Sequence, residues 1–128
     1  MAVPSLVSHL SDRIVAVTGA LAPQAAGFDP VVRPSEYADL QVDGLLPLAR
    51  VVRRNPRDLA AGVAAGLASD DLLARCDVAG PGFLNLTLTD RALNGQVARR
   101  LADPRLGVGH PDAGRTTVVD YSQPNVAK

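Results

Sequence analysis

The sequence has few of the residues from which metal sites and disulfides are built. Its 128 residues include one cysteine and two histidines, so neither an internal disulfide nor a cysteine-based metal site can form. His9 and His110 are far apart and have no ligand-like neighbours, so we expect no metal. No apolar run approaches membrane-spanning length and no signal-peptide pattern opens the chain. These absences predict a soluble, reduced, cytoplasmic protein with no membrane partner.

The chain also lacks net charge. Thirteen basic and thirteen acidic side chains balance to zero, which excludes a histone-like basic arm or an acidic tail. Lys128 is the only lysine, and that bias toward arginine indicates genome composition rather than nucleic-acid binding. Hydrophobic residues make up 47% and charged residues 20%, as in a folded protein. The length suits one domain.

Hydrophobic spacing and turn residues predict a mixture of helices and strands. We expect helices over 4–21, 43–54 and 56–68. A fourth helix is capped by Asp90 and ends before Pro104, and its Leu93, Val97 and Leu101 face inward. We expect an edge strand at 30–34 and strands at 74–79, 83–88 and 116–121, with loops at 35–44 and 104–115. Strands 74–79 and 83–88 are too close for a crossover, so they pair antiparallel. The prediction is a two-layer α+β domain, with helices on one face of a small, mainly antiparallel sheet.

Alternation along residues 83–88 separates two faces of that strand. Leu84, Leu86 and Leu88 share one face, while Phe83 and Asn85 share the other. An exposed aromatic beside an amide can stack on an unpaired base and hydrogen-bond its edge. Alternatively, a second small cluster covers Phe83, for example under the 104–115 loop. The pattern alone leaves both interpretations open.

Positive charge is concentrated near the end of the second expected helix. Residues 48–58 contain four arginines and one aspartate. Arg50, Arg53 and Arg54 could contact a phosphate backbone, or they could complement the partial negative charge of a helix C-terminus. Cys76, in mid-strand, is interpreted as a small buried hydrophobe.

Four short motifs distinguish the chain: residues 39–43 (DLQVD), 55–60 (NPRDLA), 78–85 (VAGPGFLN) and 118–128 (VVDYSQPNVAK). Together they resemble arginyl-tRNA synthetases. The third is similar to the segment that closes that family's N-terminal additional domain. The last looks like the start of its catalytic domain, directly before the HIGH-type ATP-binding motif. The first motif departs from the family pattern: Leu40 stands where the family usually has an aromatic residue, and Asp43 stands where it usually has asparagine. We therefore assign a role to neither residue.

The resemblance implies a class I ligase that joins arginine to its tRNA using ATP and Mg as substrates. It implies that residues 1–115 form the domain that binds the D-arm of an arginine-specific tRNA. The positions matching the family's contacts to a D-loop base are Phe83 and Asn85. Those matching its contacts to arginine are Asp120, Gln123 and Asn125, and its lysine near ATP matches Lys128.

Residues 116–128 would then be the first strand of a catalytic domain. No HIGH or KMSKS-type motif is present, so we expect no catalytic residue, no bound cofactor and no aminoacylation by this chain alone, which we expect to be a monomer. Two alternatives remain: a free-standing RNA-binding module, and a structural or protein-interaction domain in which Phe83 belongs to the core.

Overall fold

The computed structural model describes residues 3–110 and 113–120. Its strands are β1 (Val32–Pro34), β2 (Leu40–Val42), β3 (Leu73–Ala79) and β4 (Phe83–Leu88). They form one antiparallel sheet in the order β1-β2-β4-β3. The helices are α1 (Leu6–Leu21), a short 3₁₀ helix η1 (Pro23–Ala25), α2 (Leu45–Val51), α3 (Pro56–Leu67) and α4 (Asp90–Ala102). The α+β class and the antiparallel sheet are confirmed.

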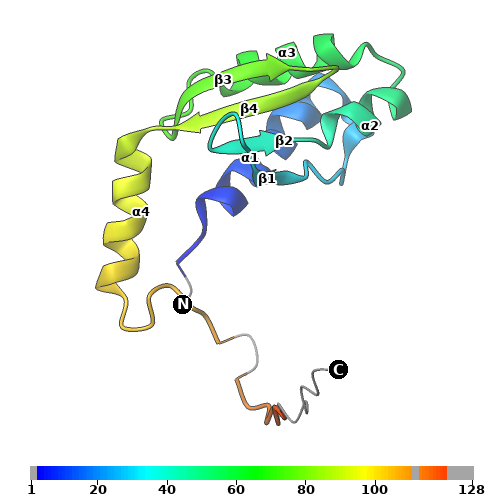
Figure 1. Ribbon diagram of the computed structural model, residues 1–128. Coiled ribbons are helices and arrows are strands. Elements are labelled where there is room, and N and C mark those ends of the chain that lie inside the picture. Colours follow the sequence, from blue (N-terminus) through cyan, green and yellow to red (C-terminus); the bar gives the residue numbers. More distant parts are fainter. Residues whose placement is uncertain (1–2, 111–112, 121–128) are drawn as a thin grey trace, which may run out of the picture.

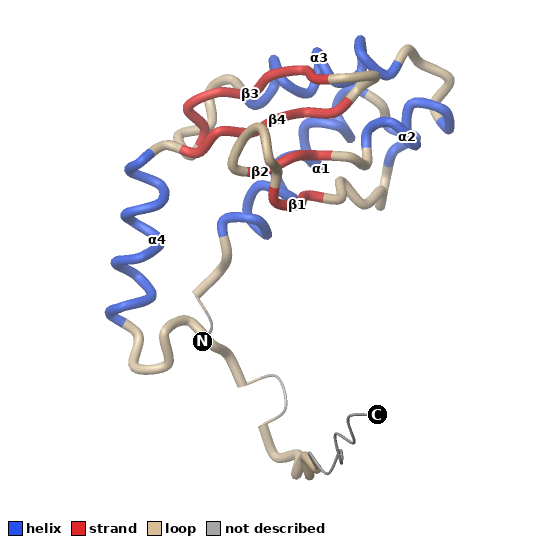
Figure 2. The backbone as a smooth tube through the Cα atoms, viewed as in Figure 1, coloured by secondary structure: helices blue, strands red, loops and turns tan. Residues whose placement is uncertain are grey.

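Three helices cover one face of the sheet and leave the other face open (Figures 1 and 2). The core lies between α1, α2, α3 and the covered face, and its apolar side chains come from both layers. Leu84 and Leu86 of β4 are fully buried there, as the alternation predicts. The helical layer contributes Leu10, Ile14, Leu45, Leu48, Leu59, Val63 and Leu67. Phe83 and Asn85 therefore stand on the open face.

Helix α3 begins where the sequence predicts. The Asn55 side chain accepts hydrogen bonds from the backbone N–H groups of Arg57, at 2.9 Å, and of Asp58, which satisfies two of the orphan donors of the first turn. Pro56 is the first helical residue, where its missing N–H costs nothing. Helix α4 differs from the prediction: Thr89 caps it, through its Oγ1 and the N–H of Ala92.

The predicted loop at 35–44 is wrong, because it contains β2. This three-residue strand lies between β1 and β4, with Leu40 opposite Leu86 and Val42 opposite Leu84. Both side chains are buried. The surrounding aspartates and glycine favour a loop, but pairing on both sides and burial of two apolar residues outweigh that local preference. The edge strand at 30–34 is confirmed as β1.

The inward face predicted for the fourth helix is also wrong. Leu93, Val97 and Leu101 are 40%, 56% and 72% exposed. Helix α4 extends away from the sheet instead of lying on it (Figure 1). The residues that face the body are Ala92 and Gln96, and the Gln96 amide donates to the carbonyl of Pro4 at 3.0 Å. Spacing of four identifies a helical face but not what covers it.

The last predicted strand is not formed in the described part of the chain. Residues 116–120 have no regular secondary structure and are exposed. The order of the sheet places β1 and β3 at its edges, and residues 116–120 pair with neither. Tyr121 lies outside the described residues. Among the residues that are described, no helix is both long and apolar enough to cross a membrane.

Candidate nucleic-acid interface

A row of polar side chains crosses the open face of the sheet. The pairing register places Arg33 of β1 opposite Gln41 of β2, Gln41 opposite Asn85 of β4, and Asn85 opposite Asp77 of β3. Cross-strand partners have Cβ atoms roughly 5 Å apart and point to the same face. The sheet thus brings together hydrogen-bonding groups that lie up to 52 positions apart in the chain, from residue 33 to residue 85.

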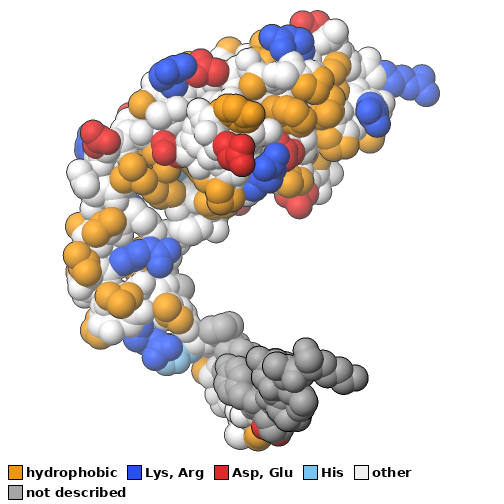
Figure 3. All heavy atoms as spheres, viewed as in Figure 1, with side chains coloured by type: hydrophobic (Ala, Val, Ile, Leu, Met, Phe, Trp, Pro, Cys, Tyr) orange, Lys and Arg blue, Asp and Glu red, His pale blue; other side chains and the backbone are white. Residues whose placement is uncertain are grey.

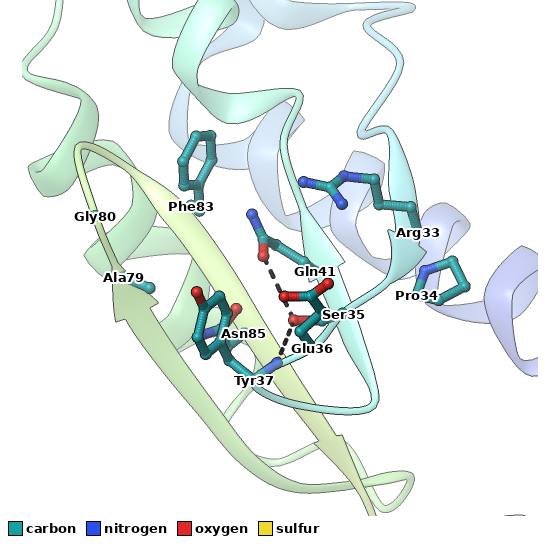
Figure 4. A pocket seen from close by; sticks show the side chains of 10 residues that line it. All are labelled: Arg33, Pro34, Ser35, Glu36, Tyr37, Gln41, Ala79, Gly80, Phe83 and Asn85. Carbon is teal, nitrogen blue, oxygen red and sulfur yellow. Dashed lines mark hydrogen bonds between the residues drawn. The ribbon is translucent and has the colours of Figure 1, made fainter.

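A pocket of about 560 Å³ opens on this face. The lining residues come from β1, the loop after it, β2 and the β3–β4 hairpin: Arg33, Pro34, Ser35, Glu36, Tyr37, Gln41, Ala79, Gly80, Phe83 and Asn85. Figure 4 shows Phe83 and Tyr37 toward opposite ends, with the Gln41 carboxamide between them. The pocket unites the two residues that resemblance assigns to a D-loop base, Phe83 and Asn85, and no described residue of the 104–115 loop lines it.

The Gly80-Pro81-Gly82 turn positions Phe83 by packing on the start of α3. Gly82 has φ +151°, and a Cβ placed there would lie 2.7 Å from the Cβ of Pro56. Only glycine allows this approach. The Arg57 guanidinium donates a hydrogen bond to the carbonyl of Gly80. The Phe83 ring lies against the turn, 3.2 Å from where a Cβ on Gly80 would stand. The start of α3 and the hairpin turn thus pack as one unit.

Hydrogen bonds fix Gln41 beside Asn85. Its Nε2 donates to Asp43 at 2.8 Å, and its Oε1 accepts from the Ser35 hydroxyl at 3.5 Å. Asp43 also pairs with Arg33, so the charge of that arginine is already compensated. The Oδ1 of Asn85 is buried and has no hydrogen-bond partner in the described structure. An unpaired buried acceptor costs about 1–3 kcal/mol.

The arginines near the end of α2 divide into two pairs. Arg54 donates to the carbonyl of Leu21 at 3.2 Å, which is the last residue of α1, so it serves a helix C-terminus. Arg57 holds the hairpin turn. Arg50 and Arg53 are exposed, and among the described residues their guanidinium groups have no hydrogen bond or ion pair. Figure 3 shows basic side chains projecting from this end of the molecule, beside apolar ones on the open face.

Of the residues predicted to contact arginine or ATP, the structure describes Asp120, and this residue does not line the pocket. Asp120 is described and exposed, while Gln123, Asn125 and Lys128 lie outside the described residues. Cys76 is half-buried and packs against the core. Burial, and the neighbouring Asp77, raise the pKa of its thiol to about 11. Across the described residues, no group of three or more metal-ligating side chains occurs.

Two pocket residues, Tyr37 and Gln41, were missed by the sequence reasoning. A signal for Gln41 exists: residues 39–43 alternate polar and apolar side chains, the period of a half-buried strand. That pattern places Gln41 on the face opposite Leu40 and Val42. No comparable signal exists for Tyr37, because it lies in the irregular loop between β1 and β2.

Comparison with known proteins identifies the family of the chain. Residues 6–88 match the family model described as the arginyl tRNA synthetase N terminal domain, a range that includes β1 to β4 and the whole pocket. The chain belongs to this family. The resemblance noted from the sequence motifs is thereby confirmed, and the matched range ends at Leu88, before α4 begins.

Full-length relatives extend well beyond this domain. The chain is 51% identical over 128 residues to the arginine–tRNA ligase of Frankia casuarinae and 48% identical to that of Streptomyces coelicolor. Each alignment covers 98% of the chain but 22% of the relative, so the chain spans about a fifth of the length of these relatives. The arginyl-tRNA synthetase structure from Thermus thermophilus has the same fold, with a TM-score of 0.56 at 21% identity over 76% of this chain and 16% of that one.

Proposed function

We propose that residues 1–115 are the tRNA-binding domain of an arginine–tRNA ligase and that the pocket on the open sheet face binds an unpaired D-loop base. The observation that carries the proposal is the juxtaposition of Phe83 and Asn85 in one pocket on the face that no helix covers. The aromatic ring offers a stacking surface, and the carboxamide offers a donor and an acceptor to the edge of the base.

The charges around the pocket favour a base over a phosphate. Glu36 lines the pocket, and its carboxylate repels an anion. Arg33, the cation in the lining, is paired with Asp43. The backbone phosphates instead meet Arg50 and Arg53, which are exposed near the start of α3. Pro56 and Arg57 at that start contact the Gly80–Gly82 turn, which leads into Phe83, and Arg53 lies three residues before Pro56 in the chain.

The catalytic reaction belongs to the longer protein. In our proposal residues 116–128 begin a class I catalytic domain, in which Asp120, Gln123 and Asn125 contact arginine and Lys128 lies near ATP, with Mg as the accompanying ion. The acid suits a guanidinium or ammonium partner. We expect the 128-residue chain alone to show no ATP–pyrophosphate exchange with arginine and tRNA. Measurable exchange by this chain alone would contradict the assignment of catalysis to the longer protein.

The test of the pocket is a filter-binding titration of an arginine-accepting tRNA transcript with Phe83→Ala. Loss of one stacking contact of roughly 1–3 kcal/mol should weaken binding by about 5- to 140-fold. Thr87→Ala is the matched control, because Thr87 lies on the same face of β4 but does not line the pocket. If Phe83→Ala and Thr87→Ala bind equally well while both remain folded, the pocket does not bind the tRNA.

A salt titration tests the arginines separately. Arg50→Gln and Arg53→Asn should each reduce the slope of log affinity against log salt by about one. Asparagine is chosen for Arg53 because that residue has φ +54°, a conformation that asparagine tolerates. Arg91→Gln on α4 removes the same charge at a distant exposed position and should leave the slope unchanged. An equal change in all three variants would mean that only net charge matters.

A further inference from the structure

We propose that Tyr37 forms the second aromatic wall of the pocket, so that the bound base is held between the rings of Tyr37 and Phe83. The inference rests on the proposed function and adds a residue to it. The two rings line the same pocket from different parts of the chain. Phe83 comes from the start of β4, and Tyr37 comes from the loop between β1 and β2 (Figure 4).

Tyr37 lines the pocket without being packed against its floor. It is 84% exposed, although a tyrosine ring ordinarily buries much of its apolar area. The ring is therefore accessible to a ligand that enters the pocket. Neither the core nor any ion pair in the described structure accounts for an aromatic residue at this position. A second stacking surface does account for it.

The loop that carries Tyr37 is held on both sides. Before Tyr37, the Ser35 hydroxyl accepts a hydrogen bond from the Tyr37 backbone N–H at 3.1 Å and donates one to Gln41 at 3.5 Å. After Tyr37, the Asp39 carboxylate accepts a hydrogen bond from the backbone N–H of Leu88 at 2.8 Å. A ring on a loop fixed in this way loses little conformational freedom when a ligand arrives.

The floor between the rings favours a flat ligand with polar edges. Gln41 and Asn85 present carboxamides there, and the Oδ1 of Asn85 has no partner within the described residues. Rotation of that carboxamide about its Cβ–Cγ bond turns its oxygen or its amino group toward the ligand. A volume of about 560 Å³ lies in the range of small-ligand sites. An unpaired nucleobase has the required shape and edges.

The experiment uses the 128-residue chain and a set of arginine-accepting tRNA transcripts, each with one D-loop nucleotide made abasic. Wild type and Phe83→Ala are compared on every transcript. The two proteins should bind with equal affinity to the transcript that lacks the bound base, and this identifies the base. Tyr37→Ala should then weaken binding of the intact transcript about tenfold and leave binding of that abasic transcript unchanged. Tyr37→Phe keeps the ring and should bind the intact transcript as the wild type does.

The outcomes separate this inference from the proposed function. If Phe83→Ala weakens binding and Tyr37→Ala does not, the second wall is refuted while the base pocket stands. If Tyr37→Ala weakens the intact and abasic transcripts equally, its effect is not through the base, and the inference is also refuted. If Phe83→Ala and the wild type bind every transcript with the same affinity, the proposed function itself fails. Circular dichroism of each variant confirms that the comparison is between folded proteins.

Discussion

Replacement of Gly82 by alanine tests whether the hairpin turn and α3 form one unit. Gly82 has φ +151°, and its missing Cβ would lie 2.7 Å from the Cβ and 3.0 Å from the carbonyl carbon of Pro56. A non-glycine residue in such a backbone conformation costs about 1–3 kcal/mol. Forcing a methyl group against a packed helix start adds about 1–3 kcal/mol. We therefore expect Gly82→Ala to lower the free energy of unfolding by about 2–6 kcal/mol.

Gly27→Ala is the matched control. Gly27 also has a positive φ, +77°, but no atom lies within 4 Å of the position of its Cβ. It therefore carries the backbone penalty of about 1–2 kcal/mol without the contact. Urea unfolding followed by circular dichroism measures both variants, since the chain has no tryptophan to report by fluorescence. A larger loss for Gly82→Ala than for Gly27→Ala reports mainly the approach of the turn to Pro56.

The same substitution has a functional consequence, because Phe83 follows Gly82 directly and Asn85 lies two residues further along β4. Displacement of the turn moves both pocket residues relative to Gln41. Gly82→Ala should therefore weaken tRNA binding by more than its unfolded fraction explains, whereas Gly27→Ala should not. If the two variants lose the same stability, the contact between Gly82 and Pro56 contributes nothing and the reasoning is refuted.

Two further predictions concern the exposed helix and the thiol. Val97→Gln on α4 should change the free energy of unfolding by less than about 0.5 kcal/mol, because Val97 is 56% exposed. Leu59→Ala in the core is the contrasting variant and should lower the free energy of unfolding by about 2–5 kcal/mol. A loss above about 1.5 kcal/mol at Val97, on the order of a buried methyl group, would show that this face of α4 is packed. Since the pKa of Cys76 is raised from 9.0 to about 11, its thiolate forms only at high pH. Allowing for the greater nucleophilicity of a high-pKa thiolate, alkylation by iodoacetamide at pH 8 should be about tenfold slower in the folded than in the urea-unfolded chain, and equal rates would contradict a buried thiol.

Local sequence determined the elements whose signals are contained in a few neighbouring residues. The side chain of Asn55 and the proline after it set the start of α3, because capping depends on atoms within one turn. Alternation over 83–88 determined which face of β4 is buried and therefore that Phe83 and Asn85 share the other. The family resemblance, too, follows from motifs in the sequence.

Tertiary structure decided what covers each face and which distant residues meet. The leucines and valine of α4 have a regular helical spacing, but nothing in that spacing shows that the helix leaves the sheet and remains exposed. Strand β2 is too short to be stable alone and exists because β1 and β4 pair with it. The pocket depends on that pairing: only the register of β1, β2 and β4 brings Tyr37 and Gln41 to Phe83 and Asn85. Sequence specified the chemistry of single residues, and long-range pairing, which no local pattern encodes, assembled them into a site.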